Sequence, residues 1–304
     1  MEEVRLTFTD FKEAVLQGVS DVAEEGYTVM SEQMQKNNGI SREGMVIRKE
    51  GCGVSPVFYF DQLYKKYLNG MPLDVMSNVI WSFYKLCKEG SPFPVEEFLD
   101  WSKIKDQLFL RVVSTEMNRE ILGDSVHREV LDLSSIVYAR IGSLSDTETG
   151  YIRIKRQHLE LWGQSEQEVY DTALQNTRKD TVCYRSVAED LKLEEEEGEM
   201  CMGRALIQMD NPMYILSNQI RQFGAVYMLF PEIMDRIVEE RDSDVFVLPS
   251  SVHETILINA TDSVSPAFLQ FMVQDVNESV VPKDEQLSNH VYIYSREKGL
   301  SIAA

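Results

Sequence analysis

The sequence predicts an α+β fold of two domains, built from mostly antiparallel sheets with helices packed on one side. Apolar residues recur with the two-residue period of strands in some segments and with the period of helices in others. These segments follow one another without the regular strand–helix alternation of parallel sheets. The 304 residues also exceed the length of an average single domain. We expect an N-terminal domain over residues 1–122 and a C-terminal domain over residues 123–304.

The expected N-terminal domain contains a helix, three strands and then further helices. Its first helix carries Phe11, Val15 and Val19 on one face, and Gly26 ends it. The sequence Asn37-Asn38-Gly39 is typical of a turn between two strands. The predicted elements are a helix over residues 10–26, strands over 27–35, 45–49 and 54–60, and helices over 61–70, 72–90 and 95–122.

The expected C-terminal domain alternates strands with helices. Gly163 ends one helix, and Ser165 and Glu168 form a capping box at the start of the next. Pro231 favours the first turn of another helix, where its missing N–H has no partner to lose. The predicted strands lie at residues 129–141, 151–155, 213–216, 225–229, 245–248, 252–260 and 290–294, and the predicted helices at 159–162, 165–174, 231–241 and 266–276.

Two segments of this domain stand out by composition. In the helix over residues 266–276 we expect the apolar side chains at helical spacing to point inward. Residues 190–199 include four consecutive glutamates, which predicts a solvated acidic loop and no metal site. The side chains expected to point inward from the helix are Phe268, Leu269, Met272 and Val276.

The net charge of -20 and the pI near 4.6 are the strongest global features of the chain. A surface of this charge repels phosphate backbones, which argues against direct binding of nucleic acid. The same charge keeps the protein soluble and favours a basic protein as its partner.

The cysteine and histidine content excludes the common metal and redox motifs. The four cysteines are widely spaced and there are only four histidines, so no metal and no cofactor is expected. The N-terminus lacks the basic and apolar regions of a signal peptide, and no apolar run reaches the roughly 20 residues of a membrane span. We therefore expect a cytoplasmic protein that does not enter a membrane. Its oligomeric state is left open.

Polar side chains gather between two predicted strands, in the stretch PSSVHE that ends at Glu254. Pro-Ser-Ser is ordinary turn chemistry, and a strand histidine is usually a hydrogen-bonded structural residue. A G-x-S-x-G elbow is missing, and Leu257 stands where a zinc H-E-x-x-H site needs its second histidine. We predict no catalytic residue here and regard four side chains as candidates for ligand or partner contact: Ser250, Ser251, His253 and Glu254.

His127, Arg128 and Asp132 are the remaining candidates for binding. His127 and Arg128 lie at the entry of a predicted strand, where an ion pair with Asp132 or Glu129 is the favoured interpretation. If His127 and Arg128 converged in space with His253, the three would instead form an anion-binding pocket on an acidic surface.

Several motifs along the chain carry a family resemblance. They are KNNGISREGMVI with VSPVFYFDQLYKKYLNG, VHREVLDLSSIVYARI, MYILSN with FGAVYML and VFVLPSSVHETILI, and VNESVVPKDEQLSNHVYIYSRE. Together they resemble the domain-of-unknown-function family 5688 of anaerobic gut bacteria, from about Phe11 to Arg296. The resemblance implies a cytoplasmic bacterial protein, often encoded near mobile elements, and supplies no activity, cofactor or catalytic residue. Where that family has an acidic proline-containing loop, this chain has Thr261-Asp262-Ser263.

These observations favour a non-enzymatic binding or interaction protein that engages a basic protein surface. Two alternatives stay open. A hydrolase would use Ser250 or Ser251 with His253 or His127, and it requires a serine oxygen about 3 Å from a histidine nitrogen. An acidic inhibitor that mimics nucleic acid would require carboxylates at the spacing of phosphates.

Overall fold

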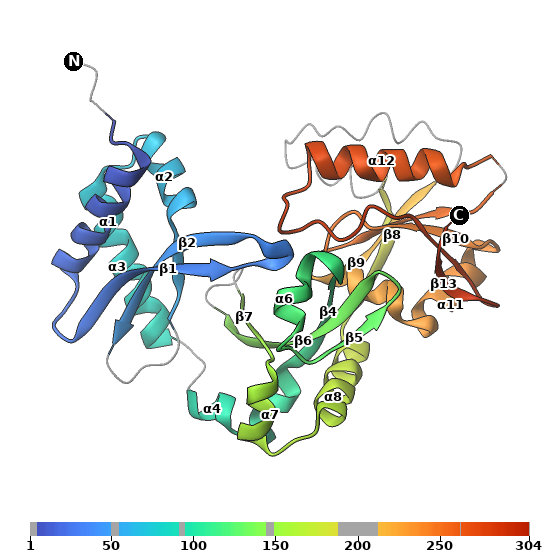
Figure 1. Ribbon diagram of the computed structural model, residues 1–304, viewed down its shortest axis with the longest axis horizontal. Coiled ribbons are helices and arrows are strands. Elements are labelled where there is room, and N and C mark those ends of the chain that lie inside the picture. The colour runs from blue at the N-terminus through green and yellow to red at the C-terminus, as the bar shows by residue number, and fades with distance from the viewer. Residues whose placement is uncertain are drawn as a thin grey trace. The chain divides into compact units, whose positions relative to one another are not determined.

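The computed structural model describes residues 5–49, 55–90, 95–143, 149–187, 212–261 and 263–303 (Figure 1). Contacts within the chain group it into two compact units. Unit 1 comprises residues 1–36, 40–104 and 140–152, and unit 2 comprises residues 37–39, 105–139 and 153–304. Residues 105–122, which the sequence analysis assigns to the N-terminal domain, therefore group with unit 2. That the chain forms two separate domains stays a prediction.

Unit 1 is built on a three-stranded antiparallel sheet in the order β1-β2-β3. Strand β1 (Tyr27–Gln35) has the predicted bounds, β2 (Ser41–Lys49) is longer and β3 (Val57–Tyr59) is shorter than predicted. The predicted turn η1 (Asn37–Gly39) joins β1 to β2, and Asn38 has a left-handed backbone there with φ 58°. The helices of this part of the chain are α1 (Phe8–Val22), α2 (Phe60–Leu68), α3 (Leu73–Gly90), α4 (Val95–Leu99) and α5 (Trp101–Ile104).

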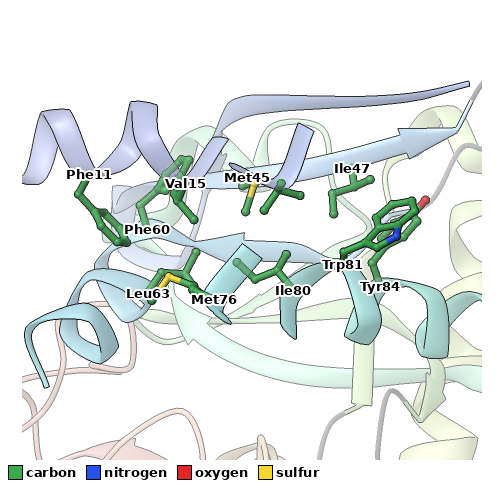
Figure 2. Packing of buried hydrophobic residues seen from close by; sticks show 11 residues of the cluster. Phe11, Val15, Met45, Ile47, Phe60, Leu63, Met76, Ile80, Trp81 and Tyr84 are labelled. Atoms are coloured by element: carbon green, nitrogen blue, oxygen red, sulfur yellow. The ribbon is translucent and has the colours of Figure 1, made fainter. Parts of the chain in front are cut away.

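The core of unit 1 lies between its first three helices and strand β2 (Figure 2). Phe11 of α1 is fully buried, as the helical spacing predicts. Met45 and Ile47 reach this core from one face of β2, because residues two apart in a strand share a face. Helix α1 begins earlier than predicted, since Thr7 caps it by accepting a hydrogen bond from the Asp10 N–H.

The prediction that residues 105–122 continue a helix is wrong, because these residues contain a buried strand. The segment forms η2 (Lys105–Gln107), β4 (Leu108–Ser114), η3 (Glu116–Asn118) and the short helix α6 (Arg119–Leu122). Strand β4 is buried along nearly its whole length. A strand covered on both faces is apolar without alternation, and its sequence therefore resembles a buried helix.

The predicted strand over residues 129–141 is two strands that form a hairpin. Strands β5 (His127–Val130) and β6 (Leu133–Ser143) pair antiparallel, with Val130 opposite Leu133. The two residues between them turn the chain, and Leu131 has φ 58°. A leucine is rare at such a position, and for this reason the sequence does not reveal the turn. Strand β6 also pairs with β4 and with β7 (Thr149–Arg153).

The next two helices follow the predicted caps. Helix α7 (Arg156–Trp162) ends at Gly163, whose backbone is left-handed with φ 61°. Helix α8 (Glu166–Lys179) starts after Ser165, whose hydroxyl oxygen accepts a hydrogen bond from the Glu168 N–H. The predicted cap at Ser165 is confirmed by this hydrogen bond, which is the one half of the predicted capping box that the structure shows.

Unit 2 contains a six-stranded antiparallel sheet in the order β13-β12-β10-β11-β9-β8. Helix α12 (Pro266–Ser279) packs on one face, as Figure 1 shows, and α11 (Pro231–Arg241) contacts the other. Every strand register that the structure describes is antiparallel, and the α+β class is confirmed. The strands are β8 (Val182–Ser186), β9 (Met213–Asn218), β10 (Val245–Leu248), β11 (Thr255–Asn259), β12 (Tyr292–Ser295) and β13 (Gly299–Ile302).

Three further predictions for unit 2 are wrong. The segment predicted as a strand at 225–229 is the 3-10 helix η4 (Gly224–Leu229). Strand β11 begins at Thr255, so His253 and Glu254 lie in a bend before it and not within a strand. In α12, Phe268 and Val276 are exposed instead of buried.

Two further predictions concern the acidic segment and the absence of a membrane-spanning helix. The acidic segment 190–199 lies outside the described residues. Of the helices in the described ranges, none has the length and the apolar character that crossing a membrane requires.

Candidate functional site

The PSSVHE bend is held in place mainly by the backbone of His253. The His253 carbonyl oxygen accepts hydrogen bonds from the Gly224 N–H and from the Ser217 hydroxyl, each at 2.8 Å. A methyl group on Gly224 would lie 2.6 Å from the Ser217 Cα, so only glycine allows η4 to approach β9 this closely. The bend thus depends on contacts between three segments that are distant in the sequence.

The imidazole of His253 is also used within the fold. Its Nδ1 accepts a hydrogen bond of 3.2 Å from the backbone N–H of Phe223, and its ring lies 4.9 Å from the Phe223 ring, centroid to centroid. An Nδ1 that accepts a hydrogen bond carries no proton, so the neutral ring holds its proton on Nε2. Nε2 faces the Glu285 carboxylate at 3.9 Å.

The environment of His253 favours this neutral form. Burial lowers the pKa of His253, the positive charge of Arg111 lowers it further, and Asp284 opposes the shift. Arg111 is itself buried on β4, and its guanidinium carbon lies 3.2 Å from the centre of the Phe223 ring and 4.0 Å from that of Tyr138. A protonated His253 would face this cation and would lose the Phe223 hydrogen bond.

Phe223 has a left-handed backbone with φ 60°, and the loop before it is fixed by a side chain. The amide group of Asn218 donates to the Gln222 carbonyl oxygen at 2.7 Å and accepts from the Gln222 N–H at 3.0 Å. A left-handed conformation costs an aromatic residue about 1–2 kcal/mol. These hydrogen bonds, together with the one to His253, hold the loop in that conformation.

The two serines of the bend form local hydrogen bonds that stabilise the turn. The Ser251 hydroxyl oxygen accepts the His253 N–H at 3.0 Å, and the Ser251 N–H donates to the Glu254 carbonyl oxygen at 3.2 Å. The Ser250 N–H donates to the Leu248 carbonyl oxygen at 2.9 Å. Within the described ranges, neither serine hydroxyl bonds to a ring nitrogen of a histidine, which is the arrangement a serine hydrolase needs.

Asp132 collects three side-chain hydrogen bonds from the C-terminal part of the chain. Ser288 donates at 2.8 Å and His290 at 2.9 Å to one carboxylate oxygen, and Tyr292 donates at 2.7 Å to the other. Burial alone would raise the pKa of Asp132, but the hydrogen bonds from His290, Tyr292 and Ser288 outweigh burial and lower this pKa. The carboxylate is therefore a charged structural anchor.

The expected pairing of Arg128 with Asp132 or Glu129 is wrong. Arg128 donates to the Glu166 carboxylate at 2.9 Å and to the Gln167 side chain at 3.1 Å, and its guanidinium lies over the Tyr170 ring. His127 bonds instead to a main-chain group, with its Nδ1 3.0 Å from the Ser125 carbonyl oxygen. The partner of Asp132 is His290, not His127 or Arg128.

One segment, Pro282–His290, contacts both groups of candidates. The Val252 N–H donates to the Glu285 carbonyl oxygen at 2.8 Å, and Ser288 and His290 bind Asp132. Asn38 donates through its side chain to the carbonyl oxygens of Lys283 and Gln286, both at 2.7 Å. The structure therefore joins Asp132 and the PSSVHE bend through this segment. The convergence of His127 and Arg128 with His253 remains a prediction.

The sequence analysis misses the residues that complete these contacts. Arg111 lies in a stretch predicted as helix, and Phe223 carries no signal because its conformation is unusual for an aromatic residue. Ser288, His290 and Tyr292 belong to a motif that was informative only as a family resemblance. Nothing in the sequence around these three residues identifies Asp132 as their acceptor.

The described ranges contain no group of three or more His, Cys, Asp or Glu residues placed to hold a metal ion. In comparisons with other proteins, a family model with the description "Family of unknown function (DUF5688)" matches residues 8–296. The match confirms the resemblance of the ordered motifs. No curated protein and no solved structure matches the chain.

Proposed function

We propose that this chain, which belongs to the DUF5688 family of unknown function, is a non-catalytic protein that binds a basic protein surface. The observation that carries the proposal is the charge, with 50 acidic against 30 basic residues. Opposite charges speed the encounter of two proteins and exclude partners of the same sign. A basic protein is the partner class that this surface favours.

The chemistry of the PSSVHE bend supports a binding function more than a hydrolytic one. A serine nucleophile needs a nearby base that accepts its proton. His253 is the nearest histidine in sequence, but its Nδ1 accepts the Phe223 N–H and its Nε2 faces Glu285. The polar groups of the bend thus stabilise the fold and leave the acidic surface as the feature available for function.

Size-exclusion chromatography at two salt concentrations tests the proposal. A tagged chain in lysate of its source cells should elute above its own 35.0 kDa at low salt, together with a basic protein in constant ratio. At roughly 0.5 M salt, where charges are screened within a few ångströms, the complex should dissociate. Elution as a 35.0 kDa species at both concentrations would contradict the proposal.

Labelling with a serine-reactive fluorophosphonate separates the proposal from the hydrolase alternative. The chain should stay unlabelled, and the variant Ser250→Ala/Ser251→Ala should behave like the native chain. Labelling that this double variant abolishes would establish a reactive serine at the bend and would overturn the non-catalytic interpretation. A cytoplasmic location and a bacterial source belong to the same proposal and stay predictions.

A further inference from the structure

We propose that the outer face of α12 is the docking surface for a basic amphipathic helix of a partner protein. The centre of this face is formed by Phe268 and Phe271. The inference rests on the proposed function and adds to it the location of the surface and the kind of partner segment.

Helix α12 buries a polar residue and exposes aromatic ones. Its buried side chains are Leu269, Val273 and Asn277. The Asn277 amide nitrogen donates to the Ser288 carbonyl oxygen at 3.0 Å and to the Asn289 side chain at 2.8 Å, and these bonds compensate for its burial. Packing and hydrogen bonds thus fix which face of α12 points inward, and Phe268 and Phe271 lie on the opposite, exposed side.

The two exposed phenylalanines of α12 are large and adjacent. Phe268 is 54% exposed and Phe271 is 65% exposed, and side chains three apart lie next to each other on a helix. Single exposed apolar residues are ordinary, but two adjacent exposed aromatic side chains are typical of interaction sites.

The residues around this apolar face are acidic. Asp275 and Glu278 are exposed on α12 itself. A partner segment therefore needs apolar side chains for the centre of the face and lysine or arginine for its edge.

Charge also decides against the other occupants of the face. A second copy of the chain would bring the same charge of -20, and an anionic membrane or a nucleic acid would likewise be repelled. A helix is the matching shape, because its apolar side chains at spacings of three and four residues can contact both Phe268 and Phe271.

A designed peptide tests the surface without knowledge of the natural partner. The probe is a fluorescent peptide of about 18 residues with leucine on one helical face and lysine on the other, long enough to become helical on contact. One control peptide has the same composition in scrambled order, and a second has glutamate in place of lysine. Binding to the full chain is measured by fluorescence anisotropy at about 0.05 M salt.

Two double variants locate the binding. Phe268→Gln/Phe271→Gln removes the aromatic centre of the face, whereas Val75→Gln/Val79→Gln changes an apolar pair of α3 that is 44% and 51% exposed. We expect the leucine–lysine peptide to bind the native chain, the α12 variant to bind it at least tenfold more weakly, and the α3 variant to bind it like the native chain. Both control peptides should bind at least tenfold more weakly than the probe.

Three outcomes would overturn the inference: no binding of the probe, equal binding by the α12 variant, or equal binding of the scrambled peptide. Circular dichroism of the variants confirms that they are folded. If the native chain forms a salt-sensitive complex in lysate but the α12 variant forms it equally well, the docking surface is wrong and the proposed function stands. If no complex forms in lysate while the probe binds as expected, the proposed function fails and the surface stands.

Discussion

His253 links three segments of unit 2 through one carbonyl oxygen and one ring nitrogen. Replacing it by alanine leaves the Phe223 N–H without its acceptor, and a buried donor that loses its partner costs about 1–3 kcal/mol. We expect His253→Ala to lower the free energy of unfolding by about this amount in urea titrations. His253→Asn is the matched control, because its Oδ1 stands near the position of Nδ1 and accepts the same bond. Equal losses in the two variants would contradict the role of Nδ1.

The pH dependence of stability tests the same residue. Burial and Arg111 lower the pKa of His253 in the folded chain, whereas the unfolded chain retains the ordinary value of about 6.5. Below that value the unfolded chain binds more protons, so stability falls as the pH decreases from about 7 towards 5. Urea titrations across this range should show a steeper fall in the native chain than in His253→Asn, in which the pKa of His158, lowered by burial, still contributes. Parallel curves would show that His253 titrates normally.

Asp132 and Tyr292 form a pair whose energy is measurable by a double-mutant cycle. Asp132→Ala leaves the buried Tyr292 hydroxyl without an acceptor, while Tyr292→Phe removes the donor as well. We expect the double variant to be more stable than the sum of the single effects predicts, by about 1–2 kcal/mol. Tyr294→Phe is the control, because its hydroxyl donates to Asp235 at 2.8 Å and its effect should add to that of Asp132→Ala.

The lowered pKa of Asp132 predicts that the folded chain loses stability in acid. Its pKa is lowered in the folded chain, so its contribution is complete above the unfolded value near 3.9 and is lost as the pH falls through the folded value. The Asp132 carboxylate is protonated at lower pH than the His253 ring, so the losses of stability from the two residues occur in different pH ranges. Asp132→Asn should flatten the acid part of the stability curve and leave the part between pH 5 and 7 unchanged.

At the scale of the element, the sequence of α12 predicts that a helix forms, but its surroundings determine which face of the helix is buried. Helical periodicity correctly predicts a helix over these residues and the burial of Leu269, but it places Phe268 and Val276 inward. Apolar residues occupy most of the helix circumference, so periodicity alone does not select the inner face. The inner face of α12 is selected by the sheet, whose apolar side chains pack against Leu269 and Val273. It is also selected by the Ser288 carbonyl oxygen, which accepts a hydrogen bond from the Asn277 side chain.

This assignment of faces is testable by stability measurements. Leu269→Ala opens a cavity in the core and should lower the free energy of unfolding by about 2–5 kcal/mol. Phe268→Gln/Phe271→Gln changes exposed side chains and should alter it by less than about 1 kcal/mol. Chemical denaturation of the two variants under the same conditions compares them. A larger loss in the phenylalanine variant than in Leu269→Ala would mean that the outer face is packed.

Other elements divide in the same way between local and tertiary causes. The caps at Gly163 and Ser165 follow from backbone conformation and from a side chain three residues away, and both are predictable. Strand β4 and helix η4 are not, because a short apolar run fits a buried strand or a buried helix equally well. In η4 the helical form follows from the contact of Gly224 with Ser217.

At the scale of the whole molecule, the two units predict how the chain melts. If they are separate domains, each with its own core, differential scanning calorimetry should resolve two transitions. Leu269→Ala lies in unit 2 and should shift one transition, while Ile80→Ala, in the core of unit 1, should shift the other. A single transition that moves in both variants would contradict the prediction of two domains.

The sequence by itself determined the class of the fold, most strand and helix positions, the family and the acidic surface. The fold class and the element positions depend on composition and on local spacing, which any segment carries regardless of its surroundings, and the family depends on the order of motifs along the chain. Only the tertiary structure decided that Asp132 anchors the segment Pro282–His290, that His253 serves the backbone of Phe223, and that Phe268 faces outward. Each of these depends on partners from distant parts of the chain, and a single sequence contains no signal that pairs them.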